Sequence, residues 1–354
     1  MHFPVRNILI FAGIFIFQTS GYAQRAKILK EINRIIRYES DDLSDTHSGL
    51  GIAVIDKDSL FQYFIGMMGQ QDTRLMDSST LFPAGGVTHL VTDLQLIREF
   101  RKGTLHQDSL LGKYLPASGY YGNITLRDLM AHRSGLPVIL PGMSHLRSNS
   151  LQPYAALTRD SICKYLNRWF ESHQSLQKSY QHSQYNYFLL SLLFENKPDE
   201  LVAPYLTHGN KASFKPSTTD LTHVPQLYNI DGLRSVPLDY AGFSYTMGLY
   251  ANLGFLSAVA FDCLHQFKDD PVLFGINKNK QGEETYISTA GFRINKEKKS
   301  WVYMMTGNSK ISTCIVLLCP ATQTGVVVTG NSGFSLHLFA MDILRMINFD
   351  WKRK

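Results

Sequence analysis

A serine followed by a lysine three residues later is a pairing that could do chemistry. On a helix this spacing puts both side chains on one face, so the amine can take the hydroxyl proton. The chain has this spacing at Ser161/Lys164 and at Ser175/Lys178. Neither serine follows a strand end that leads into an apolar helix, so we interpret both pairs as chance matches. The sequence contains no Gly-x-Ser-x-Gly elbow, no His-Glu-x-x-His pair and no phosphate-binding glycine loop.

The elements that must position a site begin with a helical pattern over 26–38. Two strand-like runs, 50–55 and 60–65, are separated by turn residues and predict an antiparallel hairpin. Apolar residues at helical spacing predict a second helix over 87–100.

The last third of the chain is rich in strand patterns. We expect strands at 286–294, 301–306, 311–319 and 326–329, with turns at 295–299 and 321–325, and a final helix over 335–347. Residues 138–153 and 207–236 are rich in Pro, Ser, Asn, Gly and Thr, which is typical of surface loops.

Strands near both ends with helices between them predict an α/β (α+β) fold. We expect an antiparallel sheet flanked by the N- and C-terminal helices, with a cleft where it meets a helical lobe. The expected sheet lobe comprises residues 24–82 and 245–354, and the mainly helical lobe comprises residues 83–244.

The N-terminal segment has the layout of a secretory signal peptide. Arg6 precedes an apolar run over 8–17, and small and polar residues follow up to Ala23. We expect residues 1–23 to be removed after Ala23. The apolar run is too short to span a bilayer, and no later stretch is long and apolar enough. The sequence therefore predicts a periplasmic or secreted protein without a membrane anchor.

Composition narrows the function classes further. The 354 residues are 44% hydrophobic and 18% charged, and the net charge of +6 is spread along the chain. No basic tract with interleaved aromatic residues occurs, so nucleic acid is not an expected partner.

The four cysteines have no metal-site spacing, and we expect neither a metal nor another cofactor. Buried free thiols are the preferred interpretation of Cys163, Cys263, Cys314 and Cys319.

An ordered set of motifs carries a resemblance to a known family. These motifs are STLFPAGGVTH at 79–89, ITLRDLMAHRSGLP at 124–137, Asn186-Tyr187, LGFLSAVAFDCLHQF at 253–267, AGFRINKEKKSWVYMMTG at 290–307 and CPATQTGVVVTGNSG at 319–333. The set resembles the serine β-lactamase family, in the branch that holds class C β-lactamases, D,D-peptidases and related esterases. Only residues 196–245 match poorly. The resemblance implies the β-lactamase/transpeptidase-like fold.

The resemblance also locates the positions where such enzymes keep their nucleophile and base. The Ser and the Lys of the first motif correspond to Gly86 and His89. Glycine has no side chain, so no covalent acyl-enzyme can form at residue 86. Thr88 is a weak candidate for a substitute nucleophile, because it is offset from residue 86 by two positions on the helix and should point elsewhere.

The other two chemical motifs are altered as well. The family's Tyr-Ser-Asn corresponds to His182-Ser183-Gln184, so the Tyr and the Asn are both replaced. The family's Lys-Thr-Gly or His-Thr-Gly corresponds to Met305-Thr306-Gly307. We interpret Met305 as packing at the cleft wall and assign no residue a catalytic role.

Three hypotheses follow from this pattern. The first is a pseudoenzyme that binds a peptide, a cell-wall fragment or a protein in a cleft lined by His89, His182, Ser183, Gln184, Thr306 and Gly307. The second is an active hydrolase in which His89 or His182 activates water or Ser183. The third is an interaction protein with no ligand in the cleft. We interpret His132 as structural, and the sequence leaves the oligomeric state open.

Overall fold

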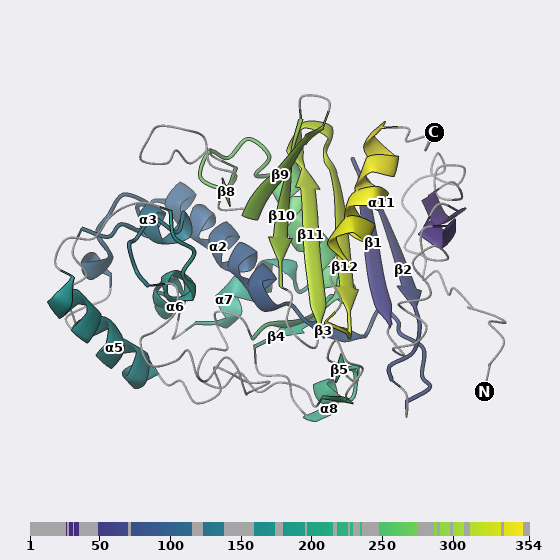
Figure 1. The fold of residues 1–354 in the computed structure, drawn as a ribbon, viewed down its shortest axis with the longest axis horizontal. Helices are drawn as coiled ribbons and strands as arrows, with labels where there is room; N and C mark the ends of the chain where they lie inside the picture. Colours follow the sequence, from purple (N-terminus) through teal and green to yellow (C-terminus); the bar gives the residue numbers. More distant parts are fainter. Residues whose placement is uncertain are drawn as a thin grey trace.

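Figure 1 shows the fold in a computed structural model of the chain. The structure describes residues 26, 28–30, 32–34, 49–69, 72–114, 123–137, 159–173, 180–194, 197–214, 218–225, 227–228, 234–235, 248–274, 287–288, 291–297, 300–307, 312–333 and 336–349. The proposed leader at 1–23 and the expected loop at 138–153 lie outside these residues. Residues 26–34 are helical where they are described, as the sequence predicts.

A seven-stranded antiparallel sheet forms the centre of the fold, in the order β2-β1-β12-β11-β10-β9-β8. Its strands are β1 Leu50–Asp56, β2 Ser59–Ile65, β8 Ile287–Ser288, β9 Gly291–Glu297, β10 Ser300–Thr306, β11 Thr313–Cys319 and β12 Thr324–Gly330. The hairpin expected from the sequence is confirmed, because β1 pairs with β2 from Leu50↔Ile65 to Asp56↔Ser59.

Both faces of the sheet are covered, because successive side chains of a strand point to opposite faces. In β1, Ile52 and Val54 belong to one hydrophobic cluster, whereas Ala53 and Ile55 belong to another. Every residue of β11 and β12 is buried, as expected for strands with helices on both sides.

The helices on the two faces come from different parts of the chain. The C-terminal helix α11 (His337–Phe349) packs on β12 and β11 and shares its cluster with Ile28 and Ile32 near the N-terminus. The first and last helices therefore flank the same face of the sheet. Helix α10 (Leu253–His265) covers the opposite face, where it packs on β12, β1 and β11.

The remaining helices are η2 Gly85–Val87, α2 Thr88–Lys102, η3 Leu111–Lys113, α3 Leu126–Met130, α5 Arg159–Ser172, α6 Gln184–Leu192, α7 Asp199–Val202, η4 Ala203–Tyr205 and α8 Thr218–Leu221. In Figure 1, α2, α3, α5, α6 and α7 lie to the left of the sheet, whereas α8 lies below it. A further 3-10 turn, η5 (Pro320–Thr322), connects β11 and β12. The first ten residues of α2, residues 88–97, are all buried, and Gly103 ends this helix in a left-handed conformation with φ 76°.

Two expectations from the sequence are wrong in detail. The single strand expected at 286–294 is the short hairpin β8–β9, in which Ile287 pairs with Phe292. The stretch expected as a loop at 207–236 contains short elements. They are α8 and the strands β4 Ala212–Ser213, β5 Leu227–Tyr228 and β6 Arg234–Ser235. β4 pairs with β7 (Tyr250–Asn252), which also pairs with β3 (Leu81–Pro83), so tertiary pairing overrides the local turn composition.

Three of the four cysteines are free and buried, as expected. Cys314 and Cys319 belong to the clusters on opposite faces of the sheet, which explains why these two do not pair. The side chain of Cys163 lies outside the described residues. No helix in the described part of the chain is long and apolar enough to cross a membrane.

Candidate functional site

Residue 86 lies where the short helix η2 leads into α2, against the end of strand β10. A Cβ atom placed on Gly86 would approach the carbonyl oxygen of Thr306 to less than 3.0 Å, a separation that real Cβ atoms essentially never show. Gly85 precedes it with φ 51°, and a Cβ there would meet the carbonyl of Gly307 equally closely. A side chain at residue 86 would therefore have to displace the backbone of β10 before any chemistry could begin.

The same contact excludes a side chain from the opposite direction. A Cβ atom on Gly307 would overlap the carbonyl oxygen of Ala84. The amide of Gly307 donates to Cys314 O at 2.7 Å, which fixes this strand end to β11. We call the contact between residues 84–86 and residues 306–307 the glycine seam. Two main chains meet in it where the resemblance places a nucleophile and its substrate.

His89 is the second residue of α2 and is 4% exposed. Its ring stacks on Tyr187 of α6, with 3.8 Å between centroids and 6° between planes. Burial, and to a lesser degree the charge of His182, lowers the pKa of His89 to about 3. The imidazole is therefore neutral near pH 7, and its Nε2 has no hydrogen-bond partner among the described residues.

His132 connects His89 with His182, with ring-centroid distances of 6.5 Å and 4.4 Å respectively. The amide of Ser183 donates to its Nδ1 at 3.2 Å, so the ring proton of neutral His132 must lie on Nε2. Its carbonyl oxygen accepts from the amide of Gln181 at 2.8 Å, and its φ of 51° is left-handed. The structural role expected of His132 is confirmed. Burial, and secondly the charge of His182, lowers its pKa well below the usual range.

Ser183 is fully buried, and its hydroxyl is already engaged. The Oγ donates to the carbonyl of Pro137 at 2.7 Å and accepts the amide of Tyr185 at 3.3 Å, which caps the start of α6. His182 is exposed and Gln184 is half-buried. The serine of the second motif thus acts as a helix cap, whereas its two neighbours remain accessible.

The motifs that survive intact form a structural joint between α3 and α6. Ser134 Oγ donates to Asn186 Oδ1 at 2.6 Å, and Asn186 Nδ2 donates to the carbonyl of Leu129 at 3.0 Å. Both polar side chains are buried. This explains physically why HRSGLP and the Asn-Tyr pair occur together in a chain that lacks the chemical residues.

A buried carboxyl group that was not expected from the sequence lies beside the histidines. Asp93 follows His89 by one turn of α2 and is 0% exposed, and Tyr187 Oη donates to its Oδ2 at 2.7 Å. Burial raises the pKa of Asp93 well above its usual value and also raises that of Tyr187. Asp93 four residues after His89 was a detectable signal, because this spacing puts both on one helix face.

The structure thus brings the predicted site residues together in two groups. Gly86 meets Thr306 and Gly307 in the glycine seam, and His89 and His182 flank His132. Met305 is half-buried and packs against the core, as expected of a cleft-wall residue. Thr88 is fully buried. No group of three or more His, Cys, Asp or Glu residues suited to a metal ion occurs in the described part of the chain.

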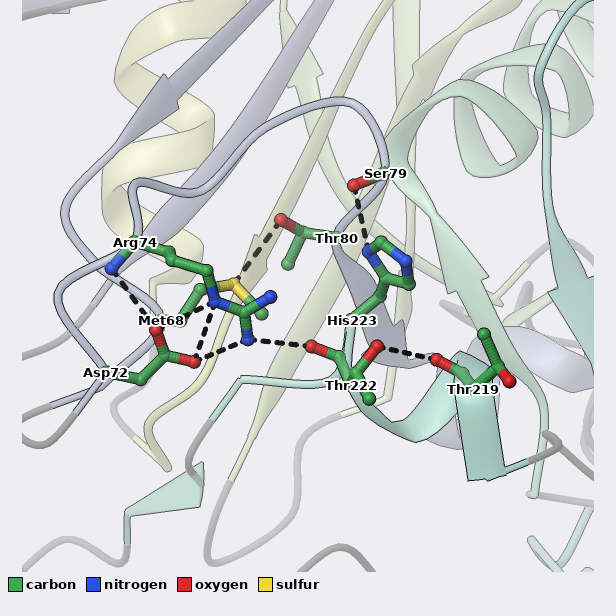
Figure 2. A network of polar contacts seen from close by, with 8 residues as sticks. All are labelled: Met68, Asp72, Arg74, Ser79, Thr80, Thr219, Thr222 and His223. Carbon is green, nitrogen blue, oxygen red and sulfur yellow. Dashed lines mark hydrogen bonds and ion pairs between the residues drawn. The ribbon is translucent and has the colours of Figure 1, made fainter.

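A second serine–histidine pair occurs outside this region, and Figure 2 shows it. Ser79 Oγ lies 2.6 Å from Asp77 Oδ1 and 3.1 Å from His223 Nδ1. A hydroxyl has one proton, and the carboxylate can only accept, so the proton goes to Asp77 and Nδ1 donates to the serine. His223 is then not a base for Ser79. With the bond from Arg74 Nη2 to the carbonyl of Thr222 at 2.8 Å, the pair fastens the loop before β3 to the end of α8.

Comparison with known proteins defines first the class of fold. A class C β-lactamase matches with a TM-score of 0.72 and 14% identity, over 93% of this chain and 97% of that chain. A class C β-lactamase in complex with cefoxitin matches with a TM-score of 0.71 and 14% identity, over 93% of this chain and 100% of that chain. The class C β-lactamase from Rhodobacter sphaeroides matches with a TM-score of 0.69 and 14% identity, over 89% of this chain and 98% of that chain. The chain has the α/β fold of these proteins.

Sequence comparison adds the family. The family described as Beta-lactamase matches residues 34–200. Penicillin-binding protein 4* of Bacillus subtilis (strain 168) is 22% identical over 213 residues, which are 60% of this chain. The chain spans 45% of the length of that relative. Together these findings support the resemblance of the chain to the serine β-lactamase and penicillin-binding-protein-like family.

Proposed function

We propose that the protein is an exported, catalytically inactive member of this family that acts by binding. The glycine seam carries the proposal, because residue 86 has neither a hydroxyl group nor the space for one. Loss of the nucleophile alone costs a serine hydrolase about 10⁶-fold in rate, or about 8 kcal/mol of barrier. A closed backbone contact at the same place leaves no position for an acyl group.

Ser183, the substitute nucleophile of the second hypothesis, also lacks what catalysis needs. Its hydroxyl donates its only proton to the carbonyl of Pro137 rather than to an imidazole. His132 already accepts the Ser183 amide at Nδ1, so it has no free lone pair to act as a base. The geometry of these residues therefore favours binding over a rewired hydrolase.

Exposure to a labelled penicillin, followed by intact-mass measurement, tests the inactive state. We expect no adduct on the wild-type chain and none on Gly86→Ser, with a class C β-lactamase as the positive control. The double variant Gly86→Ser/His89→Lys, which restores both residues, should also stay unlabelled because the glycine seam still occupies the space. A stable adduct on wild-type Ser183 or Thr88 would show that the protein is an active hydrolase.

A ligand screen then separates a binding protein from a purely structural one. We propose a peptide, a cell-wall fragment or a protein as the ligand, read by the accessible residues His182, Gln184 and Thr306. A ligand of the folded state raises the melting temperature with increasing concentration. The shift should disappear in His182→Ala and persist in His106→Ala, which removes an exposed histidine elsewhere.

Export is part of the same proposal and has its own test. The leader layout at 1–23 supports it. The N-terminal residue of the mature protein should be Gln24 when the full chain is expressed in a cell that secretes it. An uncleaved N-terminus in the cytoplasm would contradict this part.

A further inference from the structure

Two buried polar atoms on one face of α2 have no hydrogen-bond partner among the described residues. They are Asp93 Oδ1 and His89 Nε2, on side chains that are 0% and 4% exposed. Buried polar atoms in native proteins are nearly always paired, with protein groups or with ordered water. Each of these two atoms therefore needs an explanation.

Tyr187 places the two atoms in the same small region. Its ring lies flat against the His89 imidazole at 3.8 Å, and its hydroxyl donates to Asp93 Oδ2 at 2.7 Å. His89 and Asp93 are four residues apart on α2, so they are neighbours on the helix face that meets α6. They make no direct hydrogen bond to each other.

Among the described residues, the charged and titratable groups around Asp93 offer no cation to balance an ionised carboxylate. Arg98, further along α2, bonds to Asp262 and to Tyr205 Oη. On α10, the thiol of Cys263 is fully buried, and burial raises its pKa well above its usual value. His89 is neutral, as described above.

We infer that Asp93 is a neutral carboxylic acid and that one buried water molecule bridges its Oδ1 to His89 Nε2. Since Tyr187 donates to Oδ2, the acid proton lies on Oδ1. Oδ1–H donates to the water, and the water donates to Nε2, which leaves the His89 ring proton on Nδ1. The acid proton, Asp93 Oδ1 and His89 Nε2 then each have a hydrogen-bond partner, and neither side chain carries a charge.

This arrangement gives Asp93 and the water a positioning role. They set the tautomer of His89 and join α2 to α6 at the turn where the resemblance places a lysine. The inference does not depend on the protein being inactive, because it rests on the burial, hydrogen bonds and charges around Asp93 and His89.

Infrared spectroscopy tests the neutral acid. At pH 7 the wild-type protein should show the carbonyl stretch of a protonated carboxyl group, shifted by exchange into D₂O. Asp93→Asn should lose this band, whereas Asp72→Asn should retain it, because Asp72 is ion-paired to Arg74 at 2.5 Å. If Asp93→Asn does not fold, Tyr187→Phe should shift the band by removing the bond to Oδ2. A wild-type spectrum without the band, or a band that neither variant changes, overturns the neutral acid.

A crystal structure that resolves ordered solvent tests the water. We expect a solvent peak within hydrogen-bond distance of both Asp93 Oδ1 and His89 Nε2, and a weaker or displaced peak in His89→Phe, which removes one partner. A direct contact between the two side chains, or a gap without solvent density, overturns the water site.

Discussion

At residue 307 only a hydrogen atom fits between the end of β10 and the carbonyl oxygen of Ala84. We predict that Gly307→Ala lowers the free energy of unfolding by about 3 kcal/mol, because the methyl group forces two main chains apart. Urea titration measures the change. Gly112→Ala is the matched control, because a Cβ at Gly112 meets nothing within 4 Å. If both variants were equally stable, the glycine seam would be looser than the structure describes.

His89 should make the folded protein sensitive to acid. Its pKa falls from 6.5 in the unfolded chain to about 3 in the folded protein. Between these values the unfolded chain binds more protons, so the stability from His89 is complete above pH 6.5 and is lost as the pH falls towards 3. The slope is about 1.4 kcal/mol per pH unit for one such group.

Thermal melts from pH 7 to pH 4 check this prediction. His89→Phe keeps the stacking partner of Tyr187 but cannot titrate, so its melting temperature should fall less steeply with acid than that of the wild type. His106→Ala removes an exposed histidine and should leave the slope unchanged. A His89→Phe slope equal to that of the wild type would mean that His89 is protonated without cost in the folded state.

At the scale of elements, Asn186 joins three segments through one amide group. It accepts from Ser134 at 2.6 Å and donates to the carbonyl of Leu129 at 3.0 Å. We predict that Asn186→Ala destabilises the protein by about 2–3 kcal/mol, because the buried Ser134 hydroxyl loses its acceptor and the Leu129 carbonyl loses one of its donors. Denaturant midpoints measure the loss. Gln181→Ala, whose side chain is exposed on the neighbouring loop, should change the midpoint little, and equal losses would contradict the joint.

Most elements could be predicted from apolar periodicity, because the sheet and α2 bury continuous faces. The alternation over 50–65 and the helical spacing over 87–100 correspond to β1, β2 and α2 within a few residues. Apolar periodicity did not predict the strands whose pairing partners are distant in the sequence. The strand β4 is only two residues long and forms because β7 offers it an edge, which no local pattern encodes.

The candidate site was only partly predictable for a related reason. Sequence order and motif spacing placed Gly86, His89, His182 and Met305 near one cleft. The glycine seam depends on how closely β10 approaches η2, which is a tertiary distance. The glycines at 85, 86 and 307 were visible in the sequence, but they could equally have served a turn or an open cleft.

At the scale of the whole molecule, a buried ion pair ties α2 to the helix that covers the sheet. Arg98 bonds to Asp262 of α10 and to Tyr205 Oη at 2.6 Å, and Tyr205 Oη also donates to Asp262 at 2.9 Å. The two charged side chains are 19% and 7% exposed. We predict that Arg98→Met costs about 3–5 kcal/mol, because it leaves a carboxylate buried without its cation.

A double-mutant cycle checks the coupling between these residues. Arg98→Met/Asp262→Leu should cost less than the sum of the two single variants, since neither charge is then left alone. The pair Arg101–Asp270 provides the comparison, because Arg101 is 48% exposed and the pair should contribute at most about 1 kcal/mol. Additive losses at Arg98 and Asp262 would show that the pair does not act as a unit.

The close contact of Gly86 with Thr306 has a consequence for the evolution of such a chain. A serine at residue 86 would press its Cβ against the carbonyl of Thr306 and so lower stability before it could contribute any activity. The strand end would first have to move outward, and that movement has no catalytic benefit while residue 86 is glycine. If the protein is inactive as proposed, a gain of hydrolysis would require these two changes in a fixed order.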